Sequence, residues 1–278
     1  MKLCPINNRS PYSYSFLPRY INQINSSAII FIALLLFSIA SFSQSKSLDS
    51  KVYTWDSATI TNKKFATRTL FEGANLLLTK HSIYNNQLNR GISISYKKIA
   101  NVERLIMVQS GVLTVNLKGV TKDLVKGSVV FLLAEDEMEI ANNSTAGAAF
   151  YVMQYQSKTA SSNPNKKLSS SFILDWKDIV FKAHDKGGVR QYFDIQSPLL
   201  NRFDIHVTTL NPGFKSHDPH THKNEEIILM LDGNGEMQIG DSHQKSNAGD
   251  AVFLNSMVLH NITNVGTVPC LYFAIQWN

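Results

Sequence analysis

Residues 213–233 read GFKSHDPHTHKNEEIILMLDG, and this stretch decides the fold. His220 and His222 are separated by one residue, so both side chains point to the same face of an extended strand. Glu226 follows after a Lys-Asn turn and is expected to face the same cavity. The stretch therefore predicts β structure that brings two imidazoles and one carboxylate together.

A third imidazole is expected from His260, which arrives from a distant strand to complete the set. Three imidazoles and one carboxylate suit Mn, Fe, Co, Ni or Zn, and a six-coordinate metal would keep two positions open for water or substrate. We therefore predict one divalent transition metal, bound by His220, His222, Glu226 and His260.

Five further histidines lie outside this quartet. Taken singly, His206, His217 and His243 each fit an ordinary surface or hydrogen-bonded residue. His217 precedes His220 by three residues, so a contact to a ligand side chain or to substrate stays open for it.

The second half of the chain repeats the first. Pairing each residue with the one 122 positions later keeps one register over nearly ninety residues, a register that aligns Arg68 with Arg190, Phe71 with Phe193, Glu103 with Glu225, Gly111 with Gly233, Gly127 with Gly249, Asn142 with Asn264 and Gln154 with Gln276. This predicts a tandem duplication, with units at 44–156 and 172–278 and a polar linker at 157–171.

Each unit is a series of short runs rich in Val, Ile, Phe and Tyr. Examples are 103–108, 112–117, 128–133 and 149–155, and Gly or Asn separates most of them. Short runs with close turns and no long helical period indicate an all-β fold. Two small antiparallel jelly-roll barrels are expected.

The four ligand positions of the first unit hold Lys98, Ala100, Arg104 and Met138. Neither the cations nor Ala and Met are partners for a hard divalent ion, so the first barrel is expected to be metal-free. Two interpretations of Lys98 and Arg104 remain, an inward-facing anion site and solvated surface cations. The interpretation as solvated surface cations is the simpler of the two.

The N-terminus has the layout of a secretory signal. Residues 1–43 contain three basic and no acidic residues, and the apolar segment 28–40 is 13 residues long, short of the roughly 20 that cross a bilayer. Cleavage is expected between Ser43 and Gln44, which predicts a periplasmic or secreted protein with no stable membrane insertion. An uncleaved membrane anchor remains the alternative.

Charge and cysteine content exclude some classes of function. The leader carries three of the 27 basic and none of the 21 acidic residues, so the mature chain has a formal charge of +3. The basic residues are scattered and do not alternate with aromatics, which argues against nucleic-acid binding. Only Cys270 follows the leader, so no intramolecular disulfide is possible.

The second unit resembles the cupin superfamily. Its first conserved motif matches Gly213, His220, His222, Glu226 and Gly233, and its second matches Gly249, His260 and Asn264. Six residues rather than five separate Gly213 from His220, and Asn255 and Met257 replace the usual Pro and Gly. None of these departures touches a ligand position.

Two cupins with metal only in the second resemble ureidoglycine aminohydrolase over most of the mature chain. Segments 102–106, 203–206 and 211–213 look like that family's segments, whereas its ligand set reads Glu, His, His, Gln. The segment from His217 to Gly233 and the ending 272–277 look closer to exported bacterial bicupins without an assigned reaction. The resemblance implies fold and metal rather than substrate.

Two classes of function follow. One is a metal-dependent enzyme, in which the metal acts as Lewis acid on a small anionic substrate such as a uronate breakdown product, and Tyr272 or Gln276 positions that substrate. Ureidoglycine aminohydrolase-like hydrolysis and germin-like or dioxygenase-type oxidation are alternatives within it. The other class is a non-catalytic sugar- or metabolite-binding module. A homodimer is compatible with either.

Overall fold

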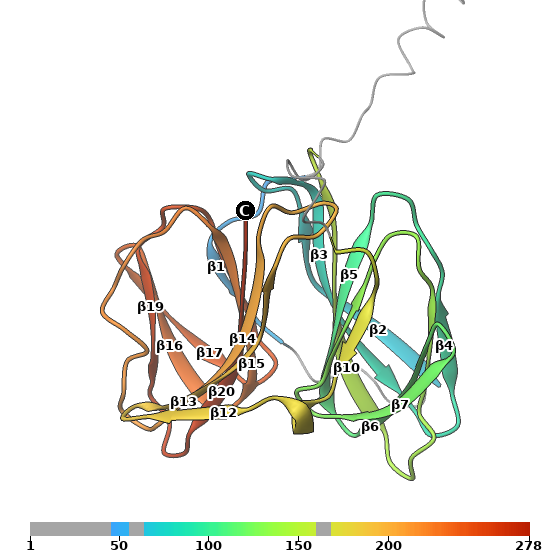
Figure 1. Ribbon diagram of the computed structural model, residues 1–278. Helices are drawn as coiled ribbons and strands as arrows, with labels where there is room; N and C mark the ends of the chain where they lie inside the picture. The colour runs from blue at the N-terminus through green and yellow to red at the C-terminus, as the bar shows by residue number, and fades with distance from the viewer. Residues whose placement is uncertain (1–45, 56–63, 160–167) are drawn as a thin grey trace, which may run out of the picture. The chain divides into compact units, whose positions relative to one another are not determined.

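Two pairs of antiparallel β-sheets form the part of the chain that the structure describes (Figure 1). This computed structural model describes residues 46–55, 64–159 and 168–278, which lie within one compact unit spanning 45–278. Strands account for nearly all regular structure in these ranges. The predicted all-β fold class is confirmed.

One short helix interrupts the strands of the described ranges, the 3₁₀ helix η2 (Trp176–Asp178). No helix within the described part of the chain is long and apolar enough to cross a membrane. The predicted leader, residues 1–43 with cleavage between Ser43 and Gln44, lies outside the described residues.

The first pair of sheets is built mainly from the N-terminal unit. Its larger sheet has six strands in the order β11-β8-β5-β10-β3-β2, namely β11 (Phe172–Leu174), β8 (Val129–Leu132), β5 (Glu103–Ser110), β10 (Ala148–Ser157), β3 (Leu78–Leu88) and β2 (Phe65–Gly73). Its smaller sheet has four strands in the order β4-β9-β6-β7, namely β4 (Ser93–Tyr96), β9 (Met138–Ala141), β6 (Val112–Leu117) and β7 (Val120–Val125). Buried apolar side chains fill the space between these sheets.

The second pair of sheets is built mainly from the C-terminal unit. Its larger sheet has seven strands, namely β1 (Lys51–Tyr53), β18 (Ala251–Leu254), β15 (Glu225–Asp232), β20 (Cys270–Trp277), β14 (Phe203–Leu210), β13 (Gly187–Ile195) and β12 (Phe181–His184). Its smaller sheet has three strands, namely β17 (Ser242–Asn247), β16 (Asn234–Ile239) and β19 (His260–Asn264). This second barrel carries the histidines of interest.

The duplication is visible strand by strand. Adding 122 to the bounds of β2, β5, β6, β7 and β8 reproduces the bounds of β13, β15, β16, β17 and β18. Cross-strand partners follow the same rule, since Arg104 lies opposite Gln154 and Glu226 lies opposite Gln276. The repeated sequence therefore builds two equivalent barrels.

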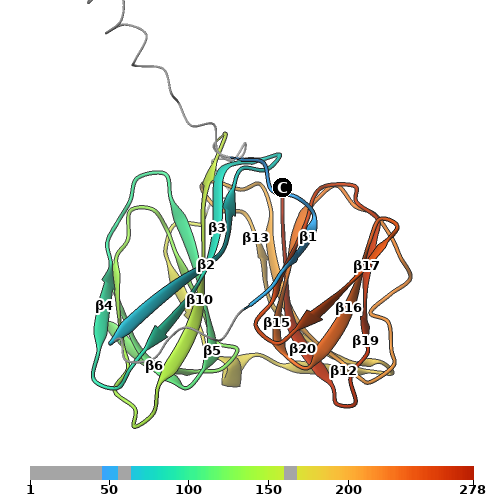
Figure 2. The ribbon, with the colours of Figure 1, turned by 180° about the vertical axis from the view of Figure 1, so that it is seen from behind.

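The outermost strands cross between the two units. β1 precedes the N-terminal barrel in sequence but pairs with β18 of the C-terminal barrel, with Val52 opposite Val252. β11 follows the polar linker but pairs with β8 of the N-terminal barrel, with Ile173 opposite Val130. Figures 1 and 2 show blue β1 among the orange and red strands. The first strand within each predicted unit, 44–156 or 172–278, therefore belongs to a sheet of the other unit.

A shared core joins the two larger sheets. Its buried members come from both barrels and include Leu105, Phe131, Ile205 and Phe253. Burying such side chains contributes about 1.5–3 kcal/mol each, so this layer is a major source of stability. The barrels therefore rest on a common apolar layer.

Equivalent hydrogen bonds of the two barrels flank this core. The Tyr155 hydroxyl donates to Glu103 Oε2 at 2.7 Å, and at the repeated positions Trp277 Nε1 donates to Glu225 Oε2 at 3.1 Å. Each carboxylate also accepts a hydrogen bond from a residue of the other barrel. The Ser197 hydroxyl donates to Glu103 Oε2 at 2.7 Å, and Leu76 N donates to Glu225 Oε1 at 2.9 Å. Burial raises the pKa of both glutamates, and these donors oppose that shift.

Candidate metal centre

Local backbone pairing brings the predicted ligands together at one end of the C-terminal barrel. His220 and His260 face each other across an isolated antiparallel bridge, with backbone N–O distances of 3.2 and 3.0 Å. The His222 carbonyl accepts a bond from Met257 N at 2.8 Å. Glu226 is the second residue of β15, and His260 is the first residue of β19.

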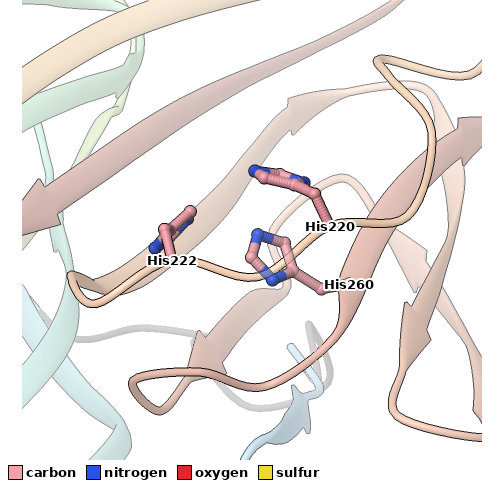
Figure 3. Close-up of side chains that lie close together, drawn as sticks. All are labelled: His220, His222 and His260. Atoms are coloured by element: carbon pink, nitrogen blue, oxygen red, sulfur yellow. The ribbon is translucent and has the colours of Figure 1, made fainter.

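The three histidine rings lie around a common point, as Figure 3 shows. Ring centroids are 4.7 Å apart for His220 and His260, 4.9 Å for His222 and His260, and 5.2 Å for His220 and His222. One nitrogen from each ring lies within 4.8 Å of the others. Glu226 Oε2 lies 3.2 Å from His222 Nε2 and 3.0 Å from His260 Nε2.

Backbone carbonyls determine which ring nitrogen of His222 and of His260 carries the proton, and so which one faces the Glu226 carboxylate unprotonated. His222 Nδ1 lies 2.9 Å from the Asn224 carbonyl, and His260 Nδ1 lies 2.8 Å from the Val258 carbonyl. A carbonyl only accepts, so we assign the proton of each neutral ring to Nδ1. Both Nε2 atoms then face Glu226 without a proton. Metal-binding histidines are held by carbonyls in this way.

This arrangement calls for a cation. Two nitrogen lone pairs and a carboxylate oxygen repel one another at 3.0–3.2 Å unless a proton or a metal ion lies between them. The contact of His260 Nε2 with Glu226 has ion-pair distance but not hydrogen-bond direction, so that buried nitrogen has no hydrogen-bond partner among the described residues. The buried Nδ1 of His220 is also without a partner.

The distances suit a first-row transition metal. Ligand atoms about 2.1 Å from such an ion, and at right angles to each other, lie about 3.0 Å apart. That matches the separations between Glu226 Oε2 and the Nε2 atoms of His222 and His260. The residues present therefore fit a divalent ion held by three imidazoles and one carboxylate.

Glu226 supplies the negative charge of the centre. It is 5% exposed, and burial alone would raise its pKa, but whenever a proton lies between its carboxylate and the rings of His222 and His260 these contacts outweigh burial and lower that pKa to about 2. The same contact raises the pKa of His222, whereas burial and the neighbouring imidazoles lower that of His220. Three neutral rings beside one carboxylate leave a bound dication with a net positive charge.

A cavity of about 240 Å³ opens beside these side chains, and Tyr272, Gln276 and His217 line it. Tyr272 is 3% exposed, and burial raises its pKa, so its phenol stays protonated and neutral. His217 is exposed, and its ring lies edge-on to His220 with centroids 4.0 Å apart.

Gln276 contacts the Glu226 carboxylate as well as lining the cavity. Its Nε2 donates to Glu226 Oε1 at 3.3 Å, and its Oε1 accepts from Asn224 Nδ2 at 3.2 Å. The sequence assigned Gln276 to the substrate, whereas these bonds orient Glu226. Because Asn224 also holds His222 through its carbonyl, the two ligands share one support.

Two cavity residues were missed by the sequence analysis. His206, interpreted there as an ordinary surface or hydrogen-bonded residue, is half-buried and lines the cavity together with Thr208. Both lie on β14, and their spacing of two along a strand was the available signal. His243 is exposed and lies 3.2 Å from Glu236, as a surface histidine would.

The equivalent positions of the first barrel differ in exposure. Lys98 is exposed, in agreement with a solvated surface cation. Arg104 is only 2% exposed, so the surface interpretation is wrong for it. Its side chain turns inward because it occupies the strand position that Glu226 holds in the other barrel.

Comparisons with known proteins agree with this geometry. Residues 206–276 match the family described as Cupin domain. Comparison with curated proteins found no match. The chain is similar to the solved structure of a putative glyoxylate induced protein from Pseudomonas aeruginosa, with 15% identity, a TM-score of 0.64, and coverage of 78% of this chain and 80% of that one.

Two further structures share the fold. The Lactobacillus farciminis oxalate decarboxylase formate complex gives 14% identity and a TM-score of 0.63, covering 83% of this chain and 87% of that one. Protein Ylba from E. coli gives 15% identity and a TM-score of 0.62, covering 80% and 88%. Likeness at this identity shows the fold alone. Residues 206–276 therefore carry a match to the Cupin domain family, and the chain shares its all-β fold with these solved structures.

Proposed function

We propose that the C-terminal barrel binds one divalent transition metal through His220, His222, Glu226 and His260. We further propose that this centre makes the protein an enzyme that acts on a small anionic metabolite, such as a uronate breakdown product. The observation that supports this most strongly is the pair of bare Nε2 atoms 3.0–3.2 Å from the Glu226 carboxylate.

Each side chain then has a definite task. A bound ion would supply Lewis acidity, stabilising negative charge that develops on a substrate oxygen. Glu226 holds the ion and Gln276 orients Glu226 through its amide. Tyr272 offers a neutral phenol at the cavity wall, which can donate a hydrogen bond to an anionic oxygen. His217, exposed at the rim, is placed to meet the distant end of the substrate.

An anionic substrate suits the charge of this centre. A dication beside a single carboxylate remains positive, and the described cavity lining contains no acidic side chain besides Glu226. A carboxylate or enediolate oxygen would therefore be favoured at an open coordination position. A neutral oxygen ligand would gain less from this field than an anionic one, and a cationic ligand would be repelled.

Oxalate decarboxylation or related oxidative chemistry is the second candidate. It is favoured by the fold shared with the oxalate decarboxylase structures and by the same preference for a small carboxylate. It requires a redox-active ion such as Mn, whereas Lewis-acid chemistry also proceeds with Zn. Reconstitution with each metal therefore distinguishes the two.

Metal analysis of the purified mature protein tests the proposal. We expect close to one transition-metal ion per chain, none in the His220→Ala/His222→Ala double variant, and an unchanged content in Lys98→Ala. Lys98 is the matched control because it occupies the position of His220 in the repeat. Two ions per chain, or an equal metal content in the double variant, would contradict the assignment.

A substrate screen follows on the metal-loaded protein. Unsaturated uronates, oxalate and ureidoglycine represent the isomerase or lyase, the oxidative and the hydrolytic alternatives. Turnover of one of them, absent from the double variant, would identify the reaction class. Binding without turnover of any of them would favour the metabolite-binding module instead.

We also propose that the protein is exported to the periplasm or secreted after removal of the leader. The support is the acid-free leader with its short apolar segment 28–40. This setting would expose the protein to products of polymer breakdown, which include uronates.

A further inference from the structure

The metal-free N-terminal barrel contains a cavity of its own, with a volume of about 430 Å³. This lies within the range of small-molecule sites, roughly 300–1,000 Å³. Six of its lining residues are the repeat equivalents of residues that line the metal cavity, at the pairs Tyr84/His206, Asn86/Thr208, Ile94/Ser216, Ser95/His217, Val152/Ala274 and Gln154/Gln276. The duplication therefore preserved the cavity even though the metal ligands were lost.

The charge behind the wall of this cavity is reversed. Where the metal barrel holds the Glu226 carboxylate beside Gln276, the first barrel holds the Arg104 guanidinium beside Gln154. Arg104 Nε donates to Gln154 Oε1 at 2.9 Å, and Nη1 donates to the Lys97 carbonyl at 3.1 Å. The guanidinium also lies over the Tyr96 ring, 5.8 Å from its centroid.

Arg104 is a buried cation without a counter-charge. It is 2% exposed, and across the described residues no Asp or Glu forms an ion pair with it. Within those same residues its Nη2 makes no hydrogen bond. Burying an unpaired charge costs several kcal/mol, so such groups normally have an anionic partner. Gln154 and Tyr96, the two side chains that hold Arg104, both line the cavity.

The cavity walls indicate what the partner looks like. Phe65, Ile94, Tyr96 and Val152 offer apolar and aromatic surface, which suits a carbon skeleton or a sugar ring. Thr67 and Asn86 offer a hydroxyl and an amide, which are linked by a 2.7 Å hydrogen bond and suit ligand hydroxyls. A guanidinium matches the planar geometry of a carboxylate.

We propose that the N-terminal barrel is a second binding site, which takes a small hydroxylated carboxylate such as a sugar acid. Its carboxylate lies towards Arg104 and Gln154, and its skeleton lies against Tyr96 and Ile94. This site needs no metal and does not rest on the chemistry proposed for the other barrel.

The test uses the His220→Ala/His222→Ala protein, in which the other barrel's metal site is disabled. Isothermal titration with D-glucuronate should show one saturable site per chain. Methyl glucoside, which has the ring without the carboxylate, and acetate, which has the carboxylate without the ring, should each bind much more weakly. No saturable glucuronate binding at millimolar concentration, or equal binding of methyl glucoside, would overturn the proposal.

Variants within this background locate the binding. Arg104→Gln should weaken glucuronate binding about 10- to 100-fold, the effect of losing a charge-assisted hydrogen-bonded pair. Lys98→Gln removes an exposed cation of the same barrel and should change nothing. If Arg104→Gln fails to fold, Thr67→Trp fills the cavity from an exposed strand position and should also abolish binding. Unchanged affinity in the folded Arg104 or Thr67 variant would refute the site.

Discussion

His81 makes the stability of the protein depend on pH, and His81→Phe should remove that dependence. His81 is fully buried in β3 at the shared core, where its ring lies edge-on to Trp277 at 5.0 Å and to Phe71 at 5.3 Å. Asn75 Nδ2 lies 3.1 Å from its Nδ1, which assigns the ring proton to Nε2. Within the part of the chain that the structure describes, Nε2 has no hydrogen-bond partner. A protonated ring would have no anion beside it, and burial lowers its pKa from 6.5 to about 3.

The size and sign of the effect follow from that shift. Below pH 6.5 the unfolded chain binds a proton at His81, whereas the folded protein does not until about pH 3. Stability is therefore present above pH 6.5 and is lost as the pH falls towards 3. Each pH unit in this window costs about 1.4 kcal/mol, so His81 should remove about 2 kcal/mol between pH 7 and pH 5.

Urea denaturation at pH 7 and pH 5 measures this loss. Phe is the matched substitution because the repeat places Phe203 at the equivalent position. His81→Phe leaves Asn75 without its acceptor, which costs about 1–3 kcal/mol at every pH and cancels from the pH difference. The variant should lose about 2 kcal/mol less than wild type over this interval, and exposed His243→Gln should behave as wild type. An unchanged pH dependence in His81→Phe would refute the reasoning.

Three further predictions concern the site, the fold and the leader. Glu226→Gln keeps an oxygen donor but removes the charge, so it should bind metal more weakly yet retain turnover when fully loaded with metal. Metal content and turnover are measured on the same sample. A loss of about 10²–10⁴ in rate at full metal occupancy would instead make the carboxylate a proton-transfer group. Gly127→Ala should lower the free energy of unfolding, measured by urea denaturation, by about 3 kcal/mol, because Gly127 has φ +86° and an added Cβ would overlap the Trp176 ring. In the control Gly91→Ala, at φ +74°, the added Cβ meets open space, so the loss should be about 1 kcal/mol. Equal losses would dismiss the steric argument. Protein from an export-competent host should begin at Gln44 by mass spectrometry, and a full-length mass in the membrane fraction would indicate an anchor.

The candidate site was largely predictable because its key spacings are local. His220 and His222 lie two residues apart and Glu226 four residues later, so a strand and a short turn suffice to direct them to one cavity. His260 was found through the second motif rather than through proximity. The role of Gln276 was not predictable, since its bond to Glu226 depends on which strand becomes the neighbour of β15.

Burial was the property that sequence patterns described least well. Arg104 and Lys98 carry the same charge in the same barrel, and both were compatible with the surface. The structure buries Arg104 and exposes Lys98, because Arg104 sits on the inward face of β5 while Lys98 lies in the loop before it. The partial burial of His206 was not predictable for the same reason, because the residue type alone does not indicate which strand will cover it.

The sequence by itself determined that the chain folds as two related all-β units and that one unit gathers three imidazoles and a carboxylate. Those features follow from the spacing of side chains along strands and from repetition, which are local. Only the tertiary structure decided that β1 and β11 pair with the opposite barrels and that Tyr155 and Trp277 serve equivalent glutamates. It also decided that Arg104 lies buried, with no Asp or Glu of the described residues paired to it. These features depend on hydrogen bonds and packing between segments far apart in sequence, which no local pattern encodes.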